Sequence, residues 1–75
     1  MRLKELREAR GMTQLYLADK LNMSQNTVSR YESHKREAGY KELIAIADFF
    51  HVSIDYLLER TDDPTFPPKK HPPSL

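Results

Sequence analysis

Apolar residues recur through the first sixty positions at the three- and four-residue spacing of amphipathic helices. The pattern predicts five helices, over about 2–10, 14–21, 25–32, 40–50 and 54–60. The apolar side chains predicted to face inward are Leu3, Leu6, Leu17, Ala18, Leu21, Val28, Tyr31, Leu43, Ile46, Ala47, Phe50, Leu57 and Leu58. The predicted fold class is therefore all-α, a compact five-helix domain.

Residues with known preferences for helix ends support these boundaries. Thr13, Ser24 and Ser53 stand where side-chain oxygens would cap the second, third and fifth helices. Gly11 and Asn22 follow the first two helices and tolerate the left-handed conformation that ends a helix.

The end of the sequence changes in character. All five prolines lie beyond residue 63, which excludes a continuous helix there. We expect a domain over 1–63 and a proline-rich tail over 64–75. The tail is expected to be either disordered or polyproline-like, or else a strap that packs Phe66 on the domain.

The second and third helices are joined by a tight turn at Asn22 and Met23, the form of a helix-turn-helix. Val28 and Tyr31 lie three apart and must face the core. The opposite side of the third helix carries Gln25, Asn26, Ser29 and Arg30. In a major groove, side-chain amides can form paired hydrogen bonds with adenine, and a guanidinium can form them with guanine. This face without acidic residues therefore predicts contacts to the bases of double-stranded DNA.

Candidate contacts to the DNA backbone surround that helix. They are Gln14, Ser24, Ser33, Lys35, Arg36, Lys41 and Arg10. Phosphate contacts would fix the register, whereas base contacts would select the sequence. Loop solubility is the alternative reading of Lys35 and Arg36.

Charge is unevenly distributed along the chain, although the net charge is only +1. Residues 1–41 hold nine Lys or Arg against five acids, a net +4, and residues 42–63 hold one Arg against six acids, a net −5. Such polarity would turn the first part of the domain toward a polyanion.

Arg7 and Glu32 are interpreted as a structural ion pair. Arg7 lies on the apolar stripe of the first helix, where an unpaired guanidinium would be costly. Glu32 ends the third helix, facing back toward the first. The pair would hold the third helix at a fixed angle; a phosphate contact is the alternative role for Arg7.

The motifs Arg-Leu-Lys-Glu-Leu-Arg, Gly-Met-Thr-Gln, Leu-Ala-Asp-Lys-Leu and Met-Ser-Gln-Asn-Thr-Val-Ser-Arg-Tyr-Glu resemble those of phage repressor and Cro proteins and their xenobiotic-response-element-type bacterial relatives. The resemblance covers about residues 2–64. It implies a lambda-repressor-like domain, usually dimeric, with the third helix in the major groove. It also implies phosphate contacts from Gln14, Ser33 and Lys35, and an ion pair between Arg7 and Glu32.

The sequence departs from that family at several positions. Asn22 replaces a common turn Gly, and Ser33-His34 replaces a common Asn-Gly, so His34 is expected at positive φ. Leu15 and Tyr16 occupy positions that are commonly charged. They could form a patch for a partner, contact phosphate through the Tyr hydroxyl, or be neutral variation.

A homodimer would need a surface far enough from the third helix to space two copies about 34 Å apart. Phe49, His51 and Tyr56, near the acidic end, are the candidate residues. The predicted function is a sequence-specific transcriptional regulator, expected to act as a repressor by occluding a promoter. The alternative is a protein-interaction module of the antitoxin or antirepressor type.

Other chemistry finds little support. There are no cysteines, and three scattered histidines lack metal-ligand spacing, so we expect no metal and no cofactor. No glycine-rich phosphate loop, signal peptide or long apolar run is present, and no small-molecule ligand is evident. We expect a non-enzymatic protein of the cytoplasm without a membrane partner.

Overall fold

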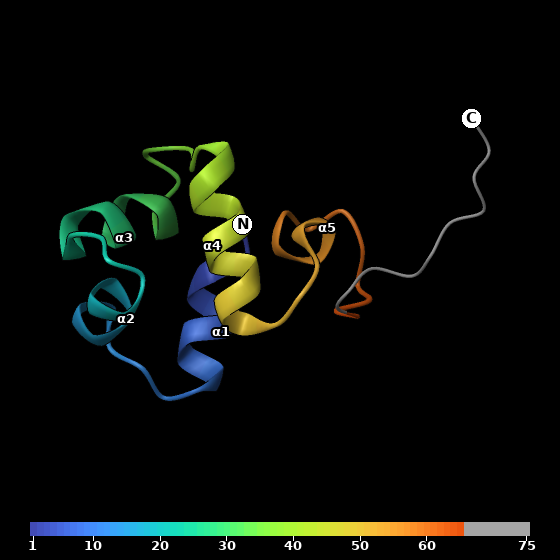
Figure 1. Ribbon diagram of the computed structural model, residues 1–75, viewed down its shortest axis with the longest axis horizontal. Helices are drawn as coiled ribbons and strands as arrows, with labels where there is room; N and C mark the ends of the chain where they lie inside the picture. Colours follow the sequence, from blue (N-terminus) through green and yellow to red (C-terminus); the bar gives the residue numbers. More distant parts are fainter. Residues whose placement is uncertain (66–75) are drawn as a thin grey trace.

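The computed structural model describes residues 1–65. Its helices are α1 (Leu3–Ala9), α2 (Gln14–Lys20), α3 (Gln25–Glu32), α4 (Tyr40–Phe50) and α5 (Ile54–Leu57) (Figure 1). No strand occurs in the described residues, and the predicted all-α class with five helices is confirmed. None of these helices combines the length and apolar character needed to cross a bilayer.

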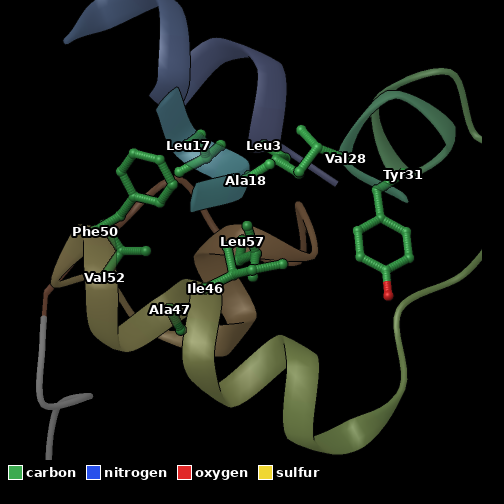
Figure 2. Packing of buried hydrophobic residues seen from close by; sticks show 10 residues of the cluster. All are labelled: Leu3, Leu17, Ala18, Val28, Tyr31, Ile46, Ala47, Phe50, Val52 and Leu57. Carbon is green, nitrogen blue, oxygen red and sulfur yellow. The ribbon is translucent and has the colours of Figure 1, made fainter. Parts of the chain in front are cut away.

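One core joins all five helices (Figure 2). Its buried residues are Leu3, Leu17, Ala18, Val28, Tyr31, Ile46, Ala47, Phe50, Val52 and Leu57. Within it α2 and α3 pack against each other, α1 packs on α3, and α4 packs on α5. Helices this short are marginal in isolation, so their stability depends on the shared burial of apolar surface.

Every described helix ends in the same backbone motif. A residue with positive φ follows the helix: Gly11, Asn22, His34, His51 and Glu59. In each case the next amide N–H bonds back to a carbonyl in the last turn, as Lys35 does to Arg30 at 2.9 Å. Asn22 and His34 adopt the positive φ expected from the sequence. The turns are therefore closed by hydrogen bonds.

Three helix starts have the predicted side-chain caps. The hydroxyls of Thr13, Ser24 and Ser53 each accept from the amide three residues on, at 3.0 to 3.1 Å. The fourth helix begins at Tyr40, and its N-cap residue, Gly39, offers no side-chain cap.

The prediction for the fifth helix was wrong at its end. The helix stops at Leu57 instead of Arg60, because Glu59 takes φ 64° and the amide of Arg60 bonds back to Asp55. Leu58, the residue after the helix, is 39 % exposed, although it was predicted to be buried. Phe66 and the prolines after it lie outside the described residues, so the structure does not address the strap.

Candidate nucleic-acid interface

The third helix presents two different faces. Val28 and Tyr31 are almost completely buried, which fixes the rotation of α3 about its axis. Gln25, Asn26 and Arg30 are exposed on the other side, and Ser29 is half-buried. The side chain of Glu32, the single acid of α3, is only 4 % exposed. The outward surface therefore carries amide, hydroxyl and guanidinium groups without a carboxylate.

Glu32 is held by a network that joins three helices. Arg7 of α1 donates from Nε to one carboxylate oxygen at 2.7 Å and from Nη2 to the other at 3.1 Å. Gln14, the first residue of α2, donates from Nε2 to Glu32 at 3.0 Å. The remaining Nη1 of Arg7 donates to the Met12 carbonyl at 2.7 Å. One carboxylate thus ties the end of α3 to α1 and to the start of α2.

The same network determines the charge state of Arg7. Its hydrogen bonds to Glu32 raise the pKa of the guanidinium, and this effect outweighs the burial that would lower it. A group whose pKa is higher in the folded state stabilises the fold at any pH below its unfolded-state pKa. Both pKa values of Arg7 lie far above neutral pH. Arg7 is therefore a permanent cation, already neutralised by Glu32.

The loop after α3 supplies exposed cations close to that helix. Ser33, His34, Lys35 and Arg36 are all exposed, and the amide of Lys35 is anchored to Arg30. Lys41 is exposed in the first turn of α4, which the loop enters (Figure 1). These residues follow α3 directly in the chain, in the α3–α4 loop and the first turn of α4.

Arg10 lies apart from these groups. Its Nη2 donates to the carbonyl of Phe50 at 2.9 Å, and its guanidinium carbon is 5.0 Å from the centre of the Phe50 ring. A cation at the carbonyl end of α4 complements the helix dipole there. Figure 1 places the α1–α2 turn at the opposite end of the α2–α3 pair from the α3–α4 loop. The structure gives Arg10 a stabilising contact and does not bring it together with Lys35, Arg36 and Lys41.

Two features of this region were not predicted from the sequence. Lys4 lines a concavity of about 400 Å³ with Gln14, Ser29 and Ser33, so it joins the group of cations near α3. Gln14 bonds to Glu32 as well as lying at the start of α2. The place of Lys4 near α3 could have been inferred, because Lys4 lies one helical turn before Arg7. No sequence signal predicts the hydrogen bond from Gln14 to Glu32.

The residues proposed for dimerisation lie on the α4–α5 side. Phe49 is partly buried and meets Phe50 edge to face, with ring centres 5.1 Å apart. Tyr56 is also partly buried, beneath the guanidinium of Arg2 at 4.4 Å. His51 is exposed. Phe49 is on α4, His51 directly follows α4, and Tyr56 is on α5, so all three are located away from α3.

The family match and the similar proteins agree on one family. Residues 3–57 match the helix-turn-helix family. The chain is 35 % identical over 63 residues to the uncharacterised HTH-type transcriptional regulator YobD of Bacillus subtilis, covering 84 % of this chain and 56 % of YobD. It is 39 % identical over 61 residues to the HTH-type transcriptional regulator ImmR of the same organism, covering 81 % and 48 %.

A third relative is the HTH-type transcriptional activator BcrR of Enterococcus faecalis, 39 % identical over 57 residues, covering 76 % of this chain and 28 % of BcrR. The chain thus spans about half the length of YobD and ImmR. No solved structure matches at the same level of significance.

Proposed function

The chain belongs to the helix-turn-helix family, and on that premise we propose that it binds double-stranded DNA in a sequence-specific way and regulates transcription. In this proposal α3 enters the major groove and reads bases with Gln25, Asn26, Ser29 and Arg30. The protein acts in the cytoplasm as a homodimeric repressor that covers a promoter.

The observation that carries the proposal is the division of α3 into a locked inner face and an acid-free outer face. Val28 and Tyr31 anchor the helix, and Glu32 is turned inward onto Arg7. An outward carboxylate would repel phosphate, whereas the amides and guanidinium match the acceptors and donors of base edges. Ordinary solvated helices mix acids and bases on their outer face.

The backbone contacts follow from the surrounding groups. Ser33, Lys35, Arg36 and Lys41 would meet one stretch of phosphates after α3. Gln14, Ser24 and Lys4 would meet another, near the starts of α2 and α3 and beside α1. Gln14 has a second amide N–H left for phosphate after bonding Glu32. Arg10 is the weakest member of the set, because its guanidinium is already engaged by Phe50.

The homodimer is proposed to form through Phe49, His51 and Tyr56. This surface is remote from α3, so an isologous contact would leave both reading helices free. Two copies would then reach half-sites on the same side of the duplex, about one helical turn apart.

Selection of bound sites from random duplex DNA tests the proposal. A two-fold symmetric consensus with a fixed half-site spacing is the expected result. Recovery of no consensus, with equal affinity for every duplex, would show that the protein only coats DNA. Titration of the affinity with salt gives a second measure, because each neutralised phosphate contributes about 0.9 to the slope of log K against log salt.

An alternative function has one observation in its favour. Leu15 and Tyr16 are adjacent on α2 and are 64 % and 51 % exposed. If a protein partner bound through these apolar side chains, its affinity would depend little on the salt concentration. A Leu15→Ser variant separates the two functions: it should leave DNA affinity nearly unchanged if the chain is a DNA reader.

A further inference from the structure

A second concavity lies behind the reading helix. It has a volume of about 510 Å³, within the range typical of small-molecule sites. Its apolar wall is formed by Met1, Ala38, Leu43 and Leu58. Leu58, the residue that follows α5, is 39 % exposed and leaves part of this apolar surface open. The cavity therefore adjoins α4, α5 and the loop that follows α3.

Tyr31 presents an unpartnered hydroxyl to this cavity. The residue is 2 % exposed, and Figure 2 shows its hydroxyl directed away from the other core side chains, toward α4 and the loop that leads into it. This hydroxyl makes no hydrogen bond to any residue in the part of the chain that the structure describes. No sealed side-chain oxygen or nitrogen lacks a partner there, so the hydroxyl opens onto the cavity. Water in the cavity can satisfy this hydroxyl, and a polar group of a bound molecule could take the place of that water.

Arg36 adds a cation beside the Tyr31 ring. Its guanidinium carbon lies 5.9 Å from the centre of the Tyr31 ring, and Arg36 also lines the cavity. Within residues 1–65 the guanidinium forms no ion pair, not even with the neighbouring Glu37. A phenol hydroxyl and a guanidinium without an ion-pair partner line the same cavity, and both can donate to a carboxylate; Glu37, which also lines it, is an exposed side chain.

We propose that this cavity binds a small amphipathic carboxylate, with its apolar part against Leu43 and Leu58 and its carboxylate on Tyr31 and Arg36. The sequence pattern did not indicate such a ligand. The regulatory consequence rests on the proposed function. Arg36 is also a proposed phosphate contact, and a guanidinium held by the ligand is withdrawn from the DNA. Occupancy of the cavity therefore weakens DNA binding, and DNA weakens ligand binding by the same factor.

The first experiment uses octanoate and the protein without DNA. Titration followed by amide chemical shifts should give a dissociation constant of about 1 mM, as expected for ten non-hydrogen atoms, with the shifts confined to residues 31, 34–38, 43 and 58. The neutral 1-octanol should bind about tenfold more weakly, because it lacks the charge that Arg36 recognises.

Variants identify the two donors. Tyr31→Phe keeps the ring and removes only the hydroxyl, so octanoate should bind about tenfold more weakly. Arg36→Gln should remove the preference for octanoate over octanol. Tyr40→Phe is the matched control, since Tyr40 is 78 % exposed and does not line the cavity; it should bind as the parent does. Unchanged octanoate binding in both folded variants, Tyr31→Phe and Arg36→Gln, or shifts located elsewhere would overturn the site.

The second experiment adds the selected duplex, with acetate as the control at equal ionic strength. Saturating octanoate should raise the dissociation constant for DNA several-fold in the parent, and much less in Tyr31→Phe at the same concentration. Octanoate binding without that change would overturn the coupling. A protein that binds octanoate at these residues but no duplex would refute the proposed function and leave the cavity assignment standing.

Discussion

Replacement of Glu32 by Ala most directly perturbs the hydrogen-bond network of Glu32, Arg7 and Gln14 that orients α3. The change removes a carboxylate that is 4 % exposed and accepts three N–H groups, two from Arg7 and one from Gln14. It leaves the Arg7 guanidinium, which is 12 % exposed, with the Met12 carbonyl at 2.7 Å and the carboxylate of the exposed Glu8 at 4.0 Å. An inward cation without its partner is the source of the expected loss.

The magnitude follows from the geometry of the pair. Breaking a buried ion pair by deleting one partner costs about 3–5 kcal/mol. The lower end applies here because Arg7 retains some contact with water. A loss of about 3 kcal/mol in a domain of this size lowers Tm by roughly 12–24 °C. The expected result is a large fall, measured as the free energy of unfolding from urea titrations followed by circular dichroism.

Two matched variants isolate the cause. Glu5→Ala removes an exposed acid that lies 3.7 Å from Arg2 at i,i+3, and it should cost less than about 0.5 kcal/mol. The double variant Arg7→Met/Glu32→Leu removes both charges and should recover most of the loss, because an apolar pair can replace a buried ion pair at similar stability. A Glu32→Ala protein that unfolds at the parent's urea concentration would refute the reasoning, as would a double variant less stable than either single change.

Three smaller changes test the interface and the fold. Arg30→Ala should cost about 1–3 kcal/mol on the selected duplex and relax the choice at one base pair; an equal loss on all duplexes would make Arg30 a phosphate contact. Lys35→Gln should weaken binding to all duplexes alike and lower the salt slope by about 1, and a loss specific to one sequence would contradict that role. Gly39→Ser should add a capping hydroxyl to α4 and form a capping box with Glu42, raising the free energy of unfolding by a few tenths of a kcal/mol. The new Cβ would lie 2.6 Å from Glu42 Oε1, so a destabilised variant would show that this carboxylate cannot turn aside.

The fold was predictable because each helix carries its own local signals. Apolar spacing located the helices, and hydroxyls at Thr13, Ser24 and Ser53 marked three of the starts. The end of the fifth helix was misplaced because periodicity alone continues a helix, whereas the chain turns at Glu59, a residue with no special preference for positive φ. A stop of this kind depends on the packing around it and not on residue type.

The candidate site was predictable to a different extent. The outward residues of α3 follow from which residues face inward, so two buried positions determined the rest. The positions of Arg10 and Gln14 could not be derived in the same way. Long polar side chains reach partners far along the chain, as Arg10 reaches Phe50 and Gln14 reaches Glu32. Such contacts depend on the tertiary arrangement, which the local pattern does not contain.

The closed turns between the helices also bear on how the protein could adapt to an imperfect operator. Each helix end is fastened by the amide that follows its positive-φ residue, so the connecting segments have little freedom to swing. A protein with flexible loops could tilt its DNA-contacting helix to fit a DNA site of altered sequence. In the proposed complex that adjustment would fall to the rotamers of Gln25, Asn26 and Arg30 and to the bending of the duplex. Tolerance of sequence variation should accordingly follow the stiffness of the DNA, including base pairs that no side chain touches.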